Sequence, residues 1–232
     1  MITLGANTET SQVVGSIKFD ISAPKSFIEN AKKLVQEWQL EQRKIITIAS
    51  THAPEEKDIL AALKLFLTEY PELLCIVVPR HPERFNEVFE VSQSLDLNTQ
   101  RRSLGQAIEQ NTQVYLADSM GEMWLWYAMS QACFVGGSLN EPGGGHNILE
   151  PIALNVPTVL GKNYFNFQTI VDEFVEASAV KIVQTAEDAA KDLVQLVYDP
   201  ALVEHLNLNA ANIMEKNKGS LAKHVQVINQ YL

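Results

Sequence analysis

Apolar runs of strand length alternate with segments of helical spacing along most of this chain, and this alternation restricts the fold more than any other feature. Each run is nearly continuous in apolar residues, which is typical of strands that are covered on both faces. Strand–helix alternation predicts right-handed βαβ units and a doubly wound parallel sheet, so we expect an α/β fold. The predicted strands lie at 44–50, 72–79, 113–118, 132–137, 156–161 and 179–183.

Helical spacing fills the segments between these strands and continues alone after residue 185. A separate helix over 24–42 precedes the first strand, and Pro24 starts it because proline is favoured at the first helical position. We find no internal repeat, so we expect one domain over 21–232 and an irregular linking segment over 1–20. The other predicted helices lie at 54–69, 83–95, 121–130, 147–154, 166–176, 186–198, 201–217 and 220–231.

The composition limits the kinds of partner that this chain is expected to bind. Hydrophobic residues make up 46% of the 232 positions, which is too many for a disordered chain. A net charge of −10 disfavours binding to nucleic acid. No apolar stretch is long enough to cross a bilayer, and the start has no secretion signal, so we expect this chain to be soluble. Cys75 and Cys133 lie in apolar runs and are expected to be buried thiols.

Four loops with unusual chemistry directly follow predicted strands. They are 50–56, 79–85, 118–123 and the glycine-rich stretch 136–151, "GGSLNEPGGGHNILEP". In an open parallel sheet, ligands bind beyond the carboxyl ends of the strands, where such loops converge. Their shared position therefore predicts one ligand site built from several loops.

The glycine-rich stretch leads into a predicted helix near Asn147. The free N–H groups and the positive dipole end of a helix bind anions. The spacing matches neither the dinucleotide fingerprint nor the P-loop. Asn147 and Glu150 also have the spacing of a capping box. Asn147 is expected both to cap the helix and to belong to the anion site. Glu150 is either an acceptor for ribose hydroxyls or a capping residue alone.

The other three loops supply side chains. Arg80 lies at the end of a strand between two prolines and suits a phosphate or carboxylate; the alternative is a surface arginine paired with Glu83 or Glu87. Gly121 is expected to expose backbone N–H groups at the start of a second helix. Glu122 follows it, and a favourable interaction with the helix dipole is the alternative explanation for this acid. A well-capped helix explains most of 50–56, and the remaining ligand candidates there are Ser50, Thr51 and His52.

Metal and nucleophile signatures are missing from the sequence. The five histidines are scattered, and no H-x-x-H, H-E-x-x-H or C-x-x-C spacing occurs. There is no G-x-S-x-G nucleophile elbow either. We therefore expect a site without metal or cofactor that binds a nucleotide-like polyanion with backbone amides and arginine.

Six motifs in this order and spacing resemble the 3-deoxy-D-manno-octulosonic acid (Kdo) transferases, and specifically their C-terminal, donor-binding domain. They are "STHAPEE", "VPRHPERF", "RRS", "LADSMGEM", "FVGGSLNEPGGGHNILEP" and "NFQTI". "GSIKFD" at 15–20 is similar to the segment that leads into that domain. The resemblance implies one Rossmann-like half of a GT-B enzyme that transfers Kdo from CMP-Kdo to the lipid A precursor, with inversion and without a donor-bound metal.

The resemblance also implies roles for particular residues. Lys18 stands where the family carries a basic residue that stabilises charge in the transition state. Ser138, Asn140 and His146 are further candidates to face the phosphate or the carboxylate of the donor. The CMP contacts carried over from the family are Pro79, Arg80, Gly121, Glu122, Met123, Asn147, Ile148, Leu149 and Glu150.

The family's N-terminal domain has no counterpart in this chain. That domain carries the acceptor site, the general base and the membrane-associated segment, so the chain by itself is expected to be inactive. For the full-length enzyme the resemblance implies the cytoplasmic face of the bacterial inner membrane. The glycine-rich loop is also slightly longer than the family pattern. Two alternatives stay open: a stand-alone nucleotide-binding module, and a UDP-dependent enzyme of the same architecture.

Overall fold

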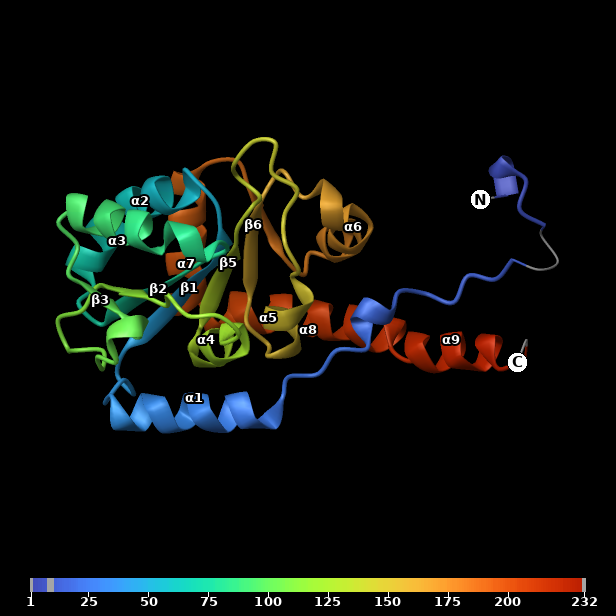
Figure 1. Cartoon of the computed structure of the whole chain (residues 1–232), viewed down its shortest axis with the longest axis horizontal. Coiled ribbons are helices and arrows are strands. Elements are labelled where there is room, and N and C mark those ends of the chain that lie inside the picture. Colours follow the sequence, from blue (N-terminus) through green and yellow to red (C-terminus); the bar gives the residue numbers. More distant parts are fainter. Residues whose placement is uncertain (1, 8–10, 231–232) are drawn as a thin grey trace.

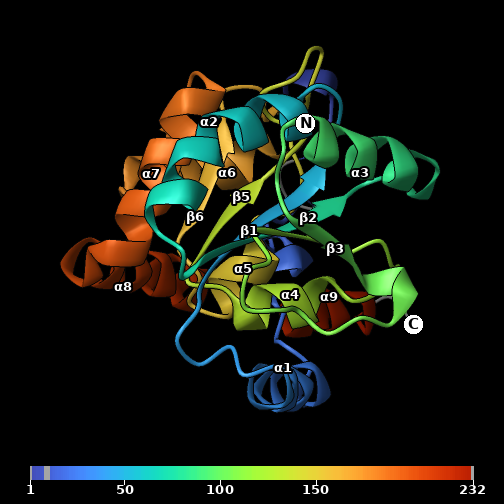
Figure 2. The ribbon, with the colours of Figure 1, turned by 90° about the vertical axis from the view of Figure 1, so that its left-hand side faces the viewer.

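The computed structural model describes residues 2–7 and 11–230, and a seven-stranded sheet lies at its centre (Figures 1 and 2). All neighbouring strands pair in parallel, in the order β3-β4-β2-β1-β5-β6-β7. The predicted doubly wound parallel sheet is confirmed. The strands are β1 (Lys44–Thr51), β2 (Leu73–Pro79), β3 (Thr99–Arg101), β4 (Val114–Leu116), β5 (Ala132–Val135), β6 (Thr158–Gly161) and β7 (Lys181–Val183).

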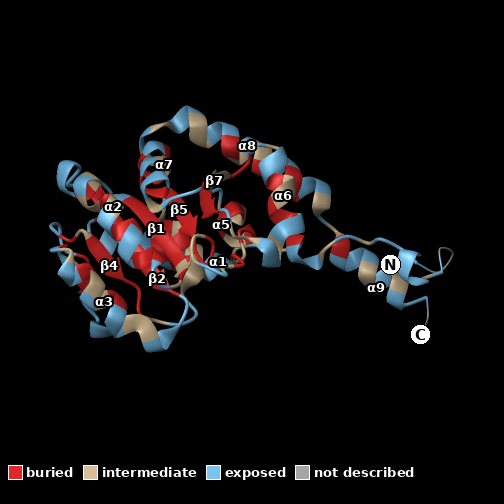
Figure 3. Ribbon diagram, turned by 90° about the horizontal axis from the view of Figure 1, so that it is seen from above, coloured by how far each residue is buried: buried red, intermediate tan, exposed pale blue. Residues whose placement is uncertain are grey.

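Helices cover both faces of this sheet (Figure 2), as the continuous apolar strands require, and the strands between them are buried (Figure 3). Short 3-10 turns precede several of them, including η2 (Ile17–Phe19) and η5 (Phe165–Phe167). The α-helices are α1 (Lys25–Glu37), α2 (Glu55–Glu69), α3 (Phe85–Ser94), α4 (Met123–Met129), α5 (Leu149–Ala153), α6 (Gln168–Glu176), α7 (Ala186–Tyr198), α8 (Pro200–Asn217) and α9 (Ser220–Ile228).

Alternate residues of each strand point into different cores. Ile46 and Ile48 of β1 pack with α2, α3 and α7 on one face. Ile45 faces the opposite core, which contains residues of α1 and α4. A third cluster joins α5, α6 and α8 beside β5 and β6. Cys75 and Cys133 are buried free thiols on β2 and β5, as expected, and burial raises the pKa of Cys133 to about 12.

Several predicted boundaries need correction. β3 was not predicted, because its sequence is polar and Gln100 is its only buried residue. The first helix ends at Glu37 instead of 42, where the chain turns through Gln39 at a φ of 56°. Pro54 caps α2 instead of occupying its first turn. The predicted end of the last helix at 231 lies outside the described residues.

Arg43 ties together three segments at the amino-terminal edge of the sheet. Its side chain is 6% exposed, and its guanidinium donates to five backbone carbonyls. The acceptors are Glu72 and Leu73 at the start of β2 and Glu109, Gln110 and Thr112 before β4. These bonds span up to 69 residues of sequence, so Arg43 fixes how the first half of the sheet closes.

The first and last elements are also joined directly. Asp20, after η2, accepts hydrogen bonds from the backbone N–H groups of Gly219 and Leu221 at 2.6 and 2.5 Å. These bonds lower the pKa of Asp20. η2 therefore lies against the start of α9, from which α9 extends away from the sheet (Figure 1). Among the described residues, no helix is both long and apolar enough to cross a membrane.

Candidate functional site

The sheet has its topological switch point between β1 and β5. The chain places β2, β4 and β3 on one side of β1, and β5, β6 and β7 on the other. The loops that leave β1 and β5 therefore diverge at the carboxyl edge, which is where open α/β sheets bind ligands. These loops carry His52 and the glycine-rich stretch, two of the four predicted ligand loops.

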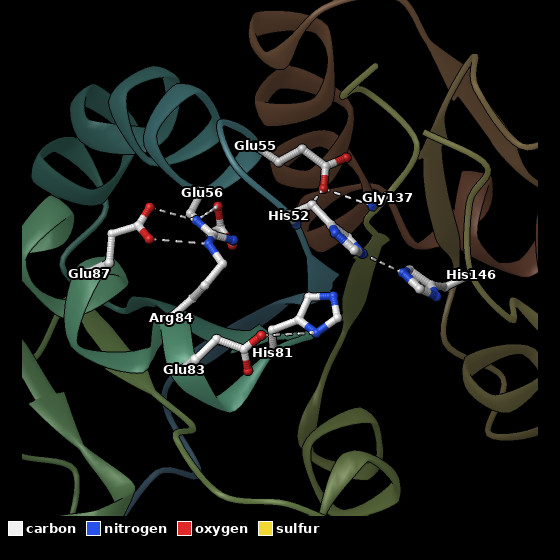
Figure 4. A network of polar contacts seen from close by, with 9 residues as sticks. All are labelled: His52, Glu55, Glu56, His81, Glu83, Arg84, Glu87, Gly137 and His146. Atoms are coloured by element: carbon white, nitrogen blue, oxygen red, sulfur yellow. Dashed lines mark hydrogen bonds and ion pairs between the residues drawn. The ribbon is translucent and has the colours of Figure 1, made fainter. Parts of the chain in front are cut away.

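Glu55, the first residue of α2, binds the start of the glycine-rich loop (Figure 4). Its carboxylate accepts from the backbone N–H groups of Gly137, Ser138 and Leu139 at 2.8 to 2.9 Å, and from that of His52 at 2.9 Å. Glu55 is only 2% exposed. The first amides of this loop are thus already satisfied by an anion that the chain itself supplies.

The glycines after this segment take left-handed conformations. Gly143, Gly144 and Gly145 have φ values of 69°, 124° and 72°. The N–H groups of Gly144 and Gly145 donate to the carbonyls of Asn163 and Gly137, so they do not present a free amide nest. The expectation for Ser138 is also corrected: it is fully buried, and its hydroxyl bonds Val135 and Gly161.

Three histidine rings meet beside Glu55 (Figure 4). Nε2 of His52 lies 2.9 Å from Nε2 of His146, and the two rings are stacked with centroids 5.2 Å apart. The ring of His81 meets that of His52 edge-on at 5.1 Å. One of the two bonded nitrogens must carry a proton and the other a lone pair, so this pair is not doubly protonated.

The electrostatics of the cluster disfavour further protonation. Burial is the main cause that lowers the pKa of His146 to about 4, and the positive charges of His52, Arg80 and His81 add to it. Burial also lowers the pKa of His52; Glu55 and Glu56 oppose this shift, while His81 and Arg84 contribute to it. The charge of a bound anion would oppose these shifts and favour the protonated rings.

Arg80 and Arg84 have different roles in the proline-flanked loop. Arg84 makes a bidentate ion pair with the buried Glu56 at 2.7 and 3.1 Å and also bonds Glu87. Arg80 is exposed, and among the described residues no carboxylate pairs with it. The alternative reading, with Arg80 neutralised by Glu83 or Glu87, is not what the structure has. The guanidinium of Arg80 remains available, and its charge acts on His146.

The start of α4 forms a second group of polar residues. Glu122 bonds Arg102 at 2.8 Å and also the hydroxyl of Ser119. Burial opposes ionisation of Glu122, but the bonds from Arg102 and Ser119 lower its pKa. Gly121 is exposed with a φ of 81°, and α4 packs against α5. The sequence motif "RRS" did not reveal that Arg102 would hold Glu122.

The start of α5 has a capped geometry. The side chain of Asn147 accepts from the N–H of Leu149 at 3.1 Å and donates to Glu150 at 3.3 Å. Burial raises the pKa of Glu150, and the bond from Asn147 opposes that shift. Ile148 and Leu149 are fully buried in the core. Neither residue is therefore exposed at the surface of the site.

The remaining residues predicted to bind the ligand differ in how far they are buried. Ser50 is partly buried in a left-handed conformation with a φ of 53°. Thr51 is fully buried, and its hydroxyl, like Oδ1 of Asn140, has no hydrogen-bond partner among the described residues. Lys18 lies on η2, with Nζ 4.4 Å from the ring centroid of Phe167.

Two contacts of the site were missed at the level of sequence. Glu55 and Glu56 were interpreted only as favourable charges in the first turn of a helix, yet they hold the glycine-rich loop and Arg84. The one available signal was two adjacent carboxylates after a strand, in a motif that also supplies ligand candidates. Within the described residues, no group of three or more histidine, cysteine or acidic side chains is suited to a metal ion.

This fold, with its loops gathered at the switch point, defines a Rossmann-like domain of the GT-B glycosyltransferase class. The model of the family "Glycosyl transferases group 1" matches residues 30–213. The chain therefore belongs to the group 1 glycosyl transferases. The resemblance to Kdo transferases expected from the motifs is confirmed by the relatives described next.

Several similar proteins are 3-deoxy-D-manno-octulosonic acid transferases. That of Haemophilus influenzae is 37% identical over 99% of this chain and 54% of its own length. That of Bordetella pertussis is 29% identical over 98% of this chain and 53% of its own. The chain thus spans about half the length of these relatives.

A solved structure gives a similar result. The C-terminal CMP-Kdo binding domain of WaaA from Acinetobacter baumannii is 60% identical, with a TM-score of 0.81, and the match covers 82% of this chain and 99% of that domain. The C-terminal domain of the group 1 protein LpcC from Francisella tularensis has a TM-score of 0.58 at 15% identity, which shows the shared fold alone.

Proposed function

We propose that this chain is the donor-binding half of an inverting glycosyltransferase that transfers Kdo from CMP-Kdo to a lipid A precursor. The observation that carries the proposal is the free guanidinium of Arg80 beside the pair of His52 and His146 at the carboxyl edge of the sheet. In a chain with net charge −10, such a local cationic group is suited to holding a phosphate. The name of the similar Acinetobacter domain supports CMP-Kdo as the ligand.

The proposed CMP site combines side chains and backbone from three loops. Arg80 and His146 bind the phosphate, and the carboxylate of Glu150, already oriented by Asn147, accepts from the ribose. Pro79 and the start of α4 border the base. Ile148 and Leu149 are contacts that the family resemblance implies, and both are buried between Asn147 and Glu150 in the sequence that starts α5. The remaining contacts in the proposal are Gly121, Glu122 and Met123, with Ser50, Thr51, His52 and Asn140 as further candidates.

The proposed chemistry is electrostatic. As the bond between sugar and phosphate breaks, charge develops on the phosphate of the leaving CMP, and preorganised donors stabilise it. Arg80 and the histidines would act there without a metal, and Lys18 would stabilise charge near the reacting sugar. We propose that residues 21–232 form this donor domain, and that 1–20 lead into it. The acceptor, the general base and the membrane association belong to the whole protein, at the cytoplasmic face of the inner membrane.

Calorimetric titration of the chain with CMP tests the proposal. We expect binding, and we expect Arg80→Ala to weaken it about tenfold because a charge-assisted contact to the phosphate is lost. Lys57→Ala is the matched control, an exposed cation on α2 without an ion pair among the described residues. UMP and UDP in the same titration test the alternative of a UDP-dependent enzyme. Absence of CMP binding at millimolar ligand would overturn the proposal.

A further inference from the structure

The loops that follow β1 and β5 hold His52 and His146 in one fixed pair (Figure 4). Their Nε2 atoms lie 2.9 Å apart and the rings are stacked. Both rings pack on Gly137, where a Cβ would lie 2.9 Å from Nε2 of His146 and 3.4 Å from Cδ2 of His52. The N–H of Gly137 donates in turn to the buried Glu55 at 2.8 Å. The pair therefore rests on a loop segment that is itself held in place.

This pair has room for one more proton. In the neutral pair, the Nε2–H of one ring, the donor ring, points at the lone pair of the other Nε2, so the donor ring has its own lone pair on Nδ1. Neither Nδ1 has a hydrogen-bond partner among the described residues. A proton added at the Nδ1 of the donor ring makes an imidazolium that still donates to its partner, through a bond that is now charge-assisted. The pair thus has a neutral and a singly charged state with the same contact.

The cations around the pair favour its neutral state. The positive charge of Arg80 acts on His146, and the backbone N–H of Arg80 donates to the carbonyl of Thr51 at 3.1 Å, beside the loop of His52. The charge of His81 acts on both rings of the pair. Like charges at this distance oppose protonation of an imidazole.

The acids near the pair are engaged elsewhere. Glu55 accepts four backbone N–H groups, and Glu56 holds Arg84 at 2.7 Å. Glu83 lies 3.7 Å from Nδ1 of His81 at the exposed side of the cluster. Among the described residues, no carboxylate bonds either ring of the pair. The negative charge that would stabilise a proton on the pair must therefore come from a ligand.

The proposed reaction creates such a charge. The phosphate of a CMP-sugar is a diester with one negative charge, whereas the CMP that leaves is a monoester whose second pKa is about 6, so it carries close to two charges at neutral pH. This second charge develops on the phosphate that Arg80 and His146 are proposed to hold. A negative charge close to an imidazole favours its protonated form. The pair is therefore suited to distinguishing the leaving phosphate from the phosphate of the substrate.

We propose that the pair of His52 and His146 takes up a proton from solvent as the leaving phosphate gains its second charge. The proton adds to Nδ1 of the donor ring, the bond between the two Nε2 atoms stays, and the phosphate keeps both its charges. When CMP leaves, the proton returns to solvent. This inference rests on the proposed function, since it takes CMP as the leaving group. It adds that the pair stabilises the departing CMP more than the bound substrate.

Calorimetric titration in buffers with different enthalpies of ionisation measures the proton uptake. At pH 7.5, where CMP is almost entirely a dianion, we expect the chain to take up at least about 0.3 proton per CMP. The methyl ester of CMP, a diester with one charge, should bind with less than about 0.1 proton. The double variant His52→Gln/His146→Gln should lose the uptake. His81→Gln, the neighbouring ring, and the exposed His205→Gln are the controls that should keep it.

Nitrogen NMR of the histidine rings tests the same step in the wild-type chain, without any variant. CMP should move the Nδ1 resonance of one ring of the pair toward the value of an imidazolium, and the methyl ester of CMP should not. Thermal unfolding checks that the variants are folded.

Two results would overturn the inference and leave the proposed function intact. One is CMP binding to the wild-type chain without proton uptake and without a change in the imidazole resonances. The other is uptake that persists in the folded double variant. A wild-type chain that does not bind CMP contradicts the proposed function itself, and the proton uptake with it.

Discussion

At the scale of single residues, buried charges organise the site. Glu55 and Glu56 are adjacent, nearly inaccessible carboxylates with different partners. Glu55 accepts backbone N–H groups of the glycine-rich loop, whereas Glu56 pairs with Arg84. Because every one of these partners comes from another loop, two consecutive residues of α2 hold two ligand loops in position.

Glu55→Gln should destabilise the chain by about 3 kcal/mol, because the amide group turns an N–H donor toward backbone N–H donors in a buried place. Urea unfolding measures this change. Hydrogen exchange should also become faster at Gly137, Ser138 and Leu139. Asp58→Asn, an exposed substitution in the same helical turn, is the control. Equal stability of the two variants would contradict the role given to Glu55.

The histidine pair predicts a pH dependence of stability. The folded-state pKa of His146 is about 4, below the ordinary value near 6.5, so the unfolded chain binds the proton more readily. The contribution of His146 is therefore complete above about pH 6.5 and is lost progressively as the pH falls toward 4. Urea unfolding between pH 7.5 and 4 should show a shallower decline in His146→Gln. His205→Gln, an exposed control, should keep the wild-type slope.

Residue identities in the site were only partly predictable from the sequence. The sequence left two interpretations of Arg80 open, and in the structure this arginine is exposed with no carboxylate partner among the described residues. Ser138 was misjudged, because a hydroxyl beside glycines gives no sign of being buried. The role of Glu55 depends on a contact across more than 80 residues, which helical spacing does not encode.

At the scale of elements, continuous apolar runs predicted six of the seven strands. They did so because each of these strands is covered on both faces by helices. β3 is an edge strand that pairs only with β4, so its sequence can be polar. Helix ends were less predictable, since α1 and α5 stop where caps and left-handed residues intervene.

Arg43→Met should weaken the contacts among the start of β1, the start of β2 and the segment before β4, which the guanidinium of Arg43 joins. Five carbonyls lose their donor, so we expect a loss of about 3 kcal/mol in the free energy of unfolding. For a domain of this size, that corresponds to a fall of roughly 10 °C in the melting temperature. Differential scanning calorimetry measures it, with Lys44→Met, the exposed neighbour, as control. A fall no larger than that of the control would show that Arg43 is dispensable.

At the scale of the whole molecule, the order of strands and helices predicted the topology and the edge at which the loops meet. It did not predict that Asp20 would bind the start of α9, about 200 residues away. Nor did it show that Lys18 would lie over the ring of Phe167, because that depends on how η2 lies against η5. The periodicity of the sequence does not predict how irregular segments pack against distant elements.

The hydrogen bonds of Glu55 affect how this domain binds its ligand. This carboxylate belongs to the chain itself, so the loop from Gly137 to Leu139 is held in its shape by an internal contact and needs no phosphate for it. Recognition at this edge is then closer to lock-and-key than to induced fit. Crystals of the empty and the loaded domain should superimpose over this segment, with rearrangement confined to side chains.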